Sequence, residues 1–118
     1  MGIASSNIGG VYTARGDQQR AEPFYREAIA TFVATQGAQH LNTGIARLKL
    51  GDSLVAQGRY DEAEKELLTG YGILTKQTSP SVSWLTRARE NLVKLYTVWH
   101  QPEKARKFQA ELGTPPSR

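Results

Sequence analysis

Apolar side chains recur every three or four positions along the chain, and glycine or proline interrupts this pattern at intervals. One apolar stripe holds Ala21, Tyr25, Ala28 and Phe32, and a second runs through 60–74. Such spacing places the apolar residues on one face of a helix. The pattern predicts an all-α chain without strands, with helices at residues 3–15, 18–36, 41–57, 60–77, 80–99 and 102–112.

Turn signals lie at matching places between these helices. Gly16 and Gly58 each separate two helices, where glycine supplies a left-handed helix end. Residues 100–102 take this place near the C-terminus, and proline is favoured at a first helical position. Ser79 and Pro80 are expected to cap the fifth helix.

The helices also repeat in sequence. The segments Ile8–Tyr12, Leu50–Leu54 and Leu92–Tyr96 align with a step of 42 residues, since 50 − 8 and 92 − 50 are both 42. A period of about 20–50 residues marks a solenoid, in which each repeat buries its apolar face against a neighbour. We therefore expect one α-solenoid domain over 1–112, with three antiparallel helix pairs at about 1–40, 41–79 and 80–112. The tail, 113–118, is expected to be frayed.

The repeats resemble the tetratricopeptide repeat family. The second repeat carries the residues on which this resemblance mainly depends, which are Leu50, Gly51, Leu54, Gly58, Tyr60, Ala63, Leu67 and Gly70. The first repeat matches at Ile8, Gly9, Tyr12, Gly16, Ala21, Tyr25 and Ala28. The third repeat matches only at Leu92, Tyr96 and Ala105, and it departs from the family pattern at Val93, His100, Pro102, Gln109 and Leu112.

The 42-residue step resembles the longer repeats of kinesin light chains. The segments 58–64 and 88–96 are also similar to the C-terminal tetratricopeptide region of bacterial serine/threonine protein kinases. The resemblance implies a right-handed superhelix that binds other proteins. It also implies that Asn7 and Asn91 contact the backbone of an extended peptide, whereas Lys49 departs from this pattern and would favour a carboxylate.

Composition narrows the range of functions. The net charge is +4, but lysine and arginine are scattered among acidic residues, which favours an ordinary solvated surface over a nucleic-acid patch. There is no cysteine, which makes a reducing cytoplasm the default expectation. No apolar run is long enough to cross a membrane, and no secretory signal is visible. We expect neither membrane association nor a cofactor.

Catalytic and metal-binding sites are not expected either. His40 lies between two repeats and His100 lies inside one, so the two histidines fall at opposite edges of a stacked solenoid. A catalytic dyad or a zinc site needs its members within direct reach. The carboxylate pairs Glu22/Glu27 and Glu64/Glu66 are interpreted as solvated charge. The chain is therefore predicted not to be an enzyme.

The concave side of the solenoid is the candidate binding surface, because the first helix of each repeat lines it. Alignment of the repeats places Asn7, Lys49 and Asn91 at one inner position, with Asp52 and Lys94 one turn further along. The complete predicted set is Asn7, Leu48, Lys49, Asp52, Glu90, Asn91 and Lys94. The alternative is that these residues are polar without binding anything. Trp84 and Trp99 are expected to pack in the core or at its edge.

The sequence thus predicts a protein-interaction module that binds an extended, acidic peptide. Two alternatives stay open. One is a regulatory or scaffolding region of a bacterial serine/threonine protein kinase. The other is self-association, and we expect a homodimer through an exposed end, since Ala105, Phe108 and Leu112 are the only apolar residues on the packing face of the last helix.

Overall fold

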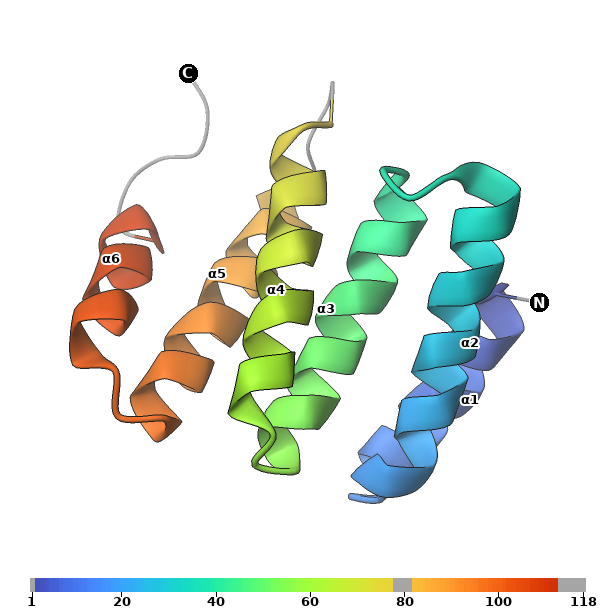
Figure 1. Ribbon diagram of the computed structural model, residues 1–118, viewed down its shortest axis with the longest axis horizontal. Coiled ribbons are helices and arrows are strands. Elements are labelled where there is room, and N and C mark those ends of the chain that lie inside the picture. The colour runs from blue at the N-terminus through green and yellow to red at the C-terminus, as the bar shows by residue number, and fades with distance from the viewer. Residues whose placement is uncertain (1, 78–81, 113–118) are drawn as a thin grey trace.

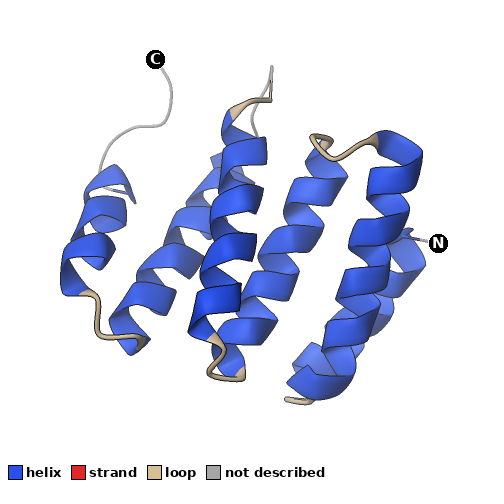
Figure 2. Cartoon of the chain, in the orientation of Figure 1, coloured by secondary structure: helices blue, strands red, loops and turns tan. Residues whose placement is uncertain are grey.

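The computed structural model describes residues 2–77 and 82–112, which form helices and connecting turns without any strand (Figures 1 and 2). The helices are α1 (Gly2–Ala14), α2 (Gln18–Gln36), α3 (Leu41–Ala56), α4 (Tyr60–Thr75), α5 (Val82–Val98) and α6 (Pro102–Leu112). Successive helices run antiparallel and stack side by side, as an α-solenoid of three helix pairs does (Figure 1). The fold-class prediction is confirmed, whereas the predicted Ser79–Pro80 cap and the frayed tail at 113–118 lie outside the described residues.

The turns inside the three helix pairs share one backbone geometry. Gly16, Gly58 and His100 have φ of 78°, 75° and 59°, all in the left-handed region. The N–H of the following residue donates to a carbonyl five positions back, which is the closing bond of a Schellman helix end. These bonds are Asp17 to Tyr12 (2.9 Å), Arg59 to Leu54 (2.9 Å) and Gln101 to Tyr96 (2.7 Å). The 42-residue sequence repeat is therefore also a structural repeat.

Glycine occupies the closest contacts inside the helix pairs. A Cβ added to Gly51 would lie 2.6 Å from Cγ of Leu67, and one added to Gly9 would lie 2.7 Å from the ring of Tyr25. Non-bonded carbon atoms normally keep about 3.5–4.0 Å, so a side chain at either position would force the helices apart. The recurring alanine near the start of each second helix is also buried in all three pairs. Small residues therefore recur where the two helices of a pair approach most closely.

Hydrogen bonds join successive repeats at equivalent positions. Glu22 on α2 accepts hydrogen bonds from Gln57 and Arg59 of the next repeat. Glu64 on α4, 42 positions later, accepts a hydrogen bond of 2.7 Å from the hydroxyl of Tyr96. Burial raises the pKa of Glu22, but hydrogen bonds from two arginines and Gln57 outweigh this effect and hold the pKa below its usual value.

The expectation that four glutamates are merely solvated is wrong for three of them. Only Glu27 is exposed, whereas the side chains of Glu22, Glu64 and Glu66 are 14%, 24% and 20% exposed. Glu66 pairs with Arg47 at 2.8 Å across the second helix pair. Sequence spacing shows which helix face carries a charge, but it does not show whether a basic side chain from another helix reaches that charge.

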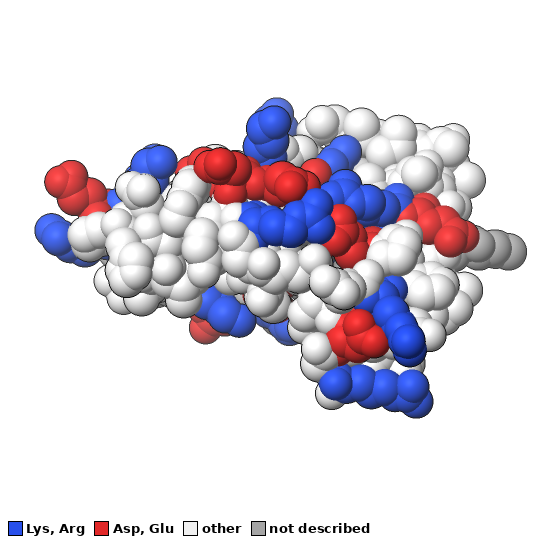
Figure 3. All heavy atoms as spheres, turned by 60° about the horizontal axis from the view of Figure 1, so that its bottom comes forward, with Lys and Arg blue, Asp and Glu red and all other residues white. Residues whose placement is uncertain are grey.

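Acidic and basic side chains are interspersed on the molecular surface. On the face seen in Figure 3, lysine and arginine alternate with aspartate and glutamate, and neither sign gathers into a large patch. Among the described residues, no helix is long and apolar enough to span a membrane. Trp99 packs against the rings of Tyr60 and Tyr96, as predicted for a tryptophan at the edge of the core.

Candidate functional site

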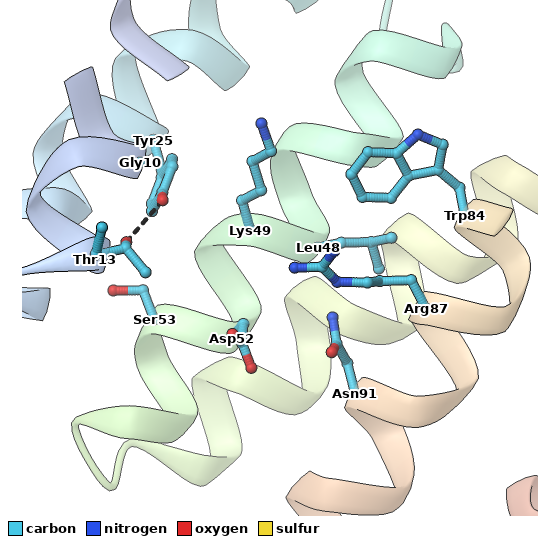
Figure 4. A pocket seen from close by; sticks show the side chains of 11 residues that line it. Gly10, Thr13, Tyr25, Leu48, Lys49, Asp52, Ser53, Trp84, Arg87 and Asn91 are labelled. Carbon is cyan, nitrogen blue, oxygen red and sulfur yellow. Dashed lines mark hydrogen bonds between the residues drawn. The ribbon is translucent and has the colours of Figure 1, made fainter. Parts of the chain in front are cut away.

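A cavity of about 280 Å³ opens between the first helices of the three repeats (Figure 4). Its lining residues are Gly10, Thr13, Ala14, Tyr25, Leu48, Lys49, Asp52, Ser53, Trp84, Arg87 and Asn91. Four of the seven residues predicted from the sequence are therefore brought together here, namely Leu48, Lys49, Asp52 and Asn91. Because α1, α3 and α5 all contribute, the site depends on the stacking of the repeats and not on any single helix.

The other three predicted residues lie around this cavity. Asn7 lies in an adjoining hollow of about 120 Å³, which Lys49 also lines. Lys94 is exposed and pairs with Asp52 at 3.6 Å, as expected of equivalent positions in neighbouring repeats. Glu90 is exposed and lines neither hollow. Whether these residues bind a ligand stays a prediction.

Packing fixes the floor of the cavity. The side chain of Leu48 belongs to the hydrophobic core, and the residue is only 1% exposed. The hydroxyl groups of Tyr25 and Thr13 lie 2.7 Å apart and link α2 to α1. The hydroxyl of Ser53 donates to the carbonyl of Gln18 at 3.3 Å. A ligand would therefore meet a preformed surface, with little ordering of the protein on binding.

Two cations lie in the upper part of the cavity as drawn in Figure 4. Lys49 extends from α3 and Arg87 extends from α5, and both side chains line the cavity. Burial lowers the pKa of Lys49, and repulsion by the charge of Arg87 lowers it further. Lys49 donates to the hydroxyl of Ser6 at 3.0 Å, and Arg87 lies 5.7 Å from the ring centre of Trp84. Within the described part of the chain, neither cation forms an ion pair.

Sequence reasoning missed Trp84 and Arg87 as lining residues. Trp84 was expected only to pack, and it does contact the core, but it also faces the cavity. A signal for both residues existed, because they lie seven and four positions before Asn91 and so share its helix face. Alignment of repeats could not reveal them, since the equivalents of Arg87 are the apolar residues Ile45 and Ile3.

A known protein family matches the first two helix pairs of this chain. The family model described as "Tetratricopeptide repeat" matches residues 1–76, about two thirds of the chain. The chain belongs to the tetratricopeptide repeat family. The match covers the first two helix pairs, in agreement with the weaker family pattern in the third. Repeats of this family are generally modules for protein–protein interaction, and their helical fold is typically non-catalytic.

A solved structure shares the fold. The crystal structure of BtubC (BKLC) from P. vanneervenii has a TM-score of 0.81 against this chain at 20% sequence identity. The alignment covers 99% of this chain and 50% of that one, so this tetratricopeptide chain spans half the length of BtubC. No curated protein matched the chain by sequence.

The side chains that commonly bind metals do not cluster in the described part of the chain. Within residues 2–77 and 82–112, no group of three or more histidine, cysteine, aspartate or glutamate side chains could hold a metal ion. His40 caps α3 by accepting the N–H of Asn42 at 3.0 Å. His100 lies in the turn between α5 and α6, at the opposite end of the helices from the turn that holds His40 (Figure 1). The two histidines therefore cannot act together.

Proposed function

We propose that the concave side of this tetratricopeptide domain binds an extended segment of another protein, with an acidic side chain of that segment held between Lys49 and Arg87. The observation that carries the proposal is that two cations line one cavity and neither has an acidic partner in the described residues. A carboxylate placed between them would offset the repulsion that lowers the pKa of Lys49. It would also form charge-assisted hydrogen bonds, the strongest kind available to such a ligand.

The rest of the cavity supplies the other contacts of an extended peptide. The amide of Asn91 can accept from one peptide N–H and donate to a neighbouring carbonyl, and Asn7 offers the same groups in the adjoining hollow. The ring of Trp84 provides an apolar wall for a residue next to the acidic one. Asp52, already paired with Lys94, would disfavour a second acidic side chain at the other end of the cavity.

A peptide selection tests this proposal. Random short peptides displayed on phage would be selected on the immobilised protein, and the recovered sequences should be enriched in aspartate and glutamate. The affinity of a synthesised winner is then measured by calorimetry for the wild type and for the double variant Lys49→Gln/Arg87→Gln. Each lost charge-assisted hydrogen bond is worth about 1.5–3 kcal/mol, so affinity should fall at least about tenfold.

A matched control removes the same charge elsewhere. Lys65 and Lys76 are exposed and lie on or next to α4, outside the cavity. Lys65→Gln/Lys76→Gln should leave affinity nearly unchanged, since rim and distant charges mainly affect association rates. Selected peptides without acidic residues, or equal losses from both double variants, would contradict the assignment.

A regulatory role beside a serine/threonine kinase and a cytoplasmic location both stay predictions, as does the absence of nucleic-acid and membrane partners. A kinase domain encoded in the same gene would support the first of these.

A further inference from the structure

The outer face of α1 is apolar but uncovered. Ile8 and Val11 are 43% and 49% exposed, and they are two of the six large apolar side chains that are exposed in the described part of the chain. Ala4 and Ile8 are spaced four residues apart and Val11 follows three later, so these three side chains share one helix face. Ala4, Ile8 and Val11 are called the stacking face below.

The same face is covered in the other two repeats. The positions 42 and 84 residues after the stacking face are Ala46, Leu50, Ser53, Ala88, Leu92 and Leu95. All six are at most 2% exposed, because α3 packs against α2 and α5 packs against α4 of the preceding repeat. The bond from Ser53 to the Gln18 carbonyl is one contact of this kind. The stacking face is therefore a solenoid interface with apolar residues and no described helix against it.

The absence of charged residues from α1 indicates which partner fits the stacking face. The sequence of α1, GIASSNIGGVYTA, contains no charged residue. In a two-fold contact the same surface patch of both copies meets itself, so a helix without charges can meet its copy without repulsion. Helix α6, at the opposite end, carries Lys104, Arg106 and Lys107 besides two glutamates, so a contact through it would place charges against an apolar face.

We infer that the stacking face of α1 binds the stacking face of a second copy of this chain, forming a two-fold dimer. An axis near Ile8 sets Ile8 against its own copy and brings the small Ala4 of each chain close to the larger Val11 of the other. This differs from the end that the sequence suggested, since the last helix buries Phe108 and exposes Arg106 and Gln109.

The dimer should be weak and dependent on concentration. A helix of 13 residues is about 20 Å long, so one face of it buries less than the roughly 800 Å² per partner of a standard stable interface. The contact leaves the cavity between α1, α3 and α5 open, because Gly10, Thr13 and Ala14 line the cavity from another side of α1.

Sedimentation equilibrium over a wide protein concentration range is the first test. The wild type should fit a monomer–dimer equilibrium, and Ile8→Glu should raise the dimer dissociation constant at least about tenfold, because it places a carboxylate in an apolar contact. Leu68→Glu is the control, since Leu68 is similarly exposed, at 40%, but lies on α4. Circular dichroism verifies that both variants stay helical.

Single-cysteine variants give a second test that does not depend on disrupting the contact. The chain has no cysteine, so Ile8→Cys introduces the only thiol. Under mild oxidation it should form a disulfide-linked dimer much faster than Leu68→Cys does. A protein that stays monomeric at the highest concentration, or equal cross-linking of the two variants, would overturn the inference. Species larger than a dimer that are weakened by Arg106→Glu would also overturn it, because they would indicate head-to-tail stacking.

Discussion

At the scale of single residues, the turn at His100 stores strain that the other two turns avoid. His100 has φ of 59°, whereas the equivalent positions of the first two repeats hold Gly16 and Gly58. A side chain in this region costs roughly 1–2 kcal/mol relative to the ordinary helical conformation, and glycine avoids that cost. We therefore expect His100→Gly to raise the free energy of unfolding by about 1 kcal/mol, measured by urea denaturation.

The reverse change at the second repeat is the control. Gly58→Ala should lower the free energy of unfolding by about 1 kcal/mol, because nothing near Gly58 would compensate the strained backbone. If both variants moved stability in the same direction, the left-handed geometry at His100 would not be the source of the strain.

A second residue-scale prediction concerns close helix packing. Gly51→Ala should destabilise the protein by about 1–3 kcal/mol, since the new Cβ would overlap the side chain of Leu67 and approach its backbone nitrogen at 3.3 Å. Gly72 is the matched control, because it lies inside α4 with nothing within 4 Å of an added Cβ. Gly72→Ala should stabilise by about 0.4–1 kcal/mol. Thermal unfolding that showed equal effects at both sites would contradict the packing role of Gly51.

Sequence reasoning succeeded for residues whose role follows from their place in the repeat. Gly9 and Gly51 were placed at equivalent positions of the repeat pattern, and both prove to lie in close helix contacts. Asp52 and Lys94 were placed at equivalent positions of neighbouring repeats, and they form an ion pair. Sequence reasoning failed for Arg87, which replaces the apolar residues of the other repeats. Which residue of a neighbouring helix a charged side chain meets depends on the angle at which the two helices pack. That angle cannot be read from a single sequence.

At the scale of helices, one carboxylate links the first two repeats through hydrogen bonds. Glu22 joins α2 to the next repeat through Gln57 and Arg59, and these bonds hold its pKa below the usual value. A group whose pKa is lowered by folding stabilises the protein above its unfolded pKa, near about 4.3, and loses this contribution as pH falls through the folded pKa. Stability should therefore decline on the acid side of this range.

The variant Glu22→Gln isolates this effect. It should be less stable than the wild type at neutral pH, and the difference between them should shrink as the pH falls through the lowered pKa of Glu22, because the carboxylate of the wild type then becomes protonated. Urea denaturation at several pH values measures both quantities. Glu27→Gln is the control, since Glu27 is an exposed neighbour on the same helix. A difference that stayed constant with pH would mean that the charge of Glu22 does not stabilise the interface.

Helix positions were the most predictable elements, and their ends differ from the structure by two residues or fewer. The helical periodicity and the turn residues act locally, so a sequence carries them directly. The cavity and the stacking face arise between helices that are distant in sequence. The stacking face follows from the difference in burial between equivalent positions of the repeats, and the cavity follows from the side chains that α1, α3 and α5 bring together.

At the scale of the whole molecule, the repeats share interfaces and should unfold together. Both tryptophans, Trp84 and Trp99, lie in the third repeat, whereas far-ultraviolet circular dichroism reports all six helices. In a short array, strong coupling between neighbours makes partial unfolding costly. Tryptophan fluorescence and circular dichroism should therefore give coincident urea transitions for the wild type.

A pair of equivalent substitutions tests this coupling across the molecule. Leu92 lies at the interface of the second and third repeats and Leu50 at that of the first and second, and both are at most 1% exposed. Leu92→Ala and Leu50→Ala should each cost about 2–5 kcal/mol, the usual range for a buried leucine. Because the repeats are coupled, Leu50→Ala should shift the fluorescence transition of the distant tryptophans as far as it shifts the circular dichroism transition. A fluorescence transition that stayed at the wild-type midpoint would show that the third repeat unfolds independently, and the molecule would then be two cooperative units.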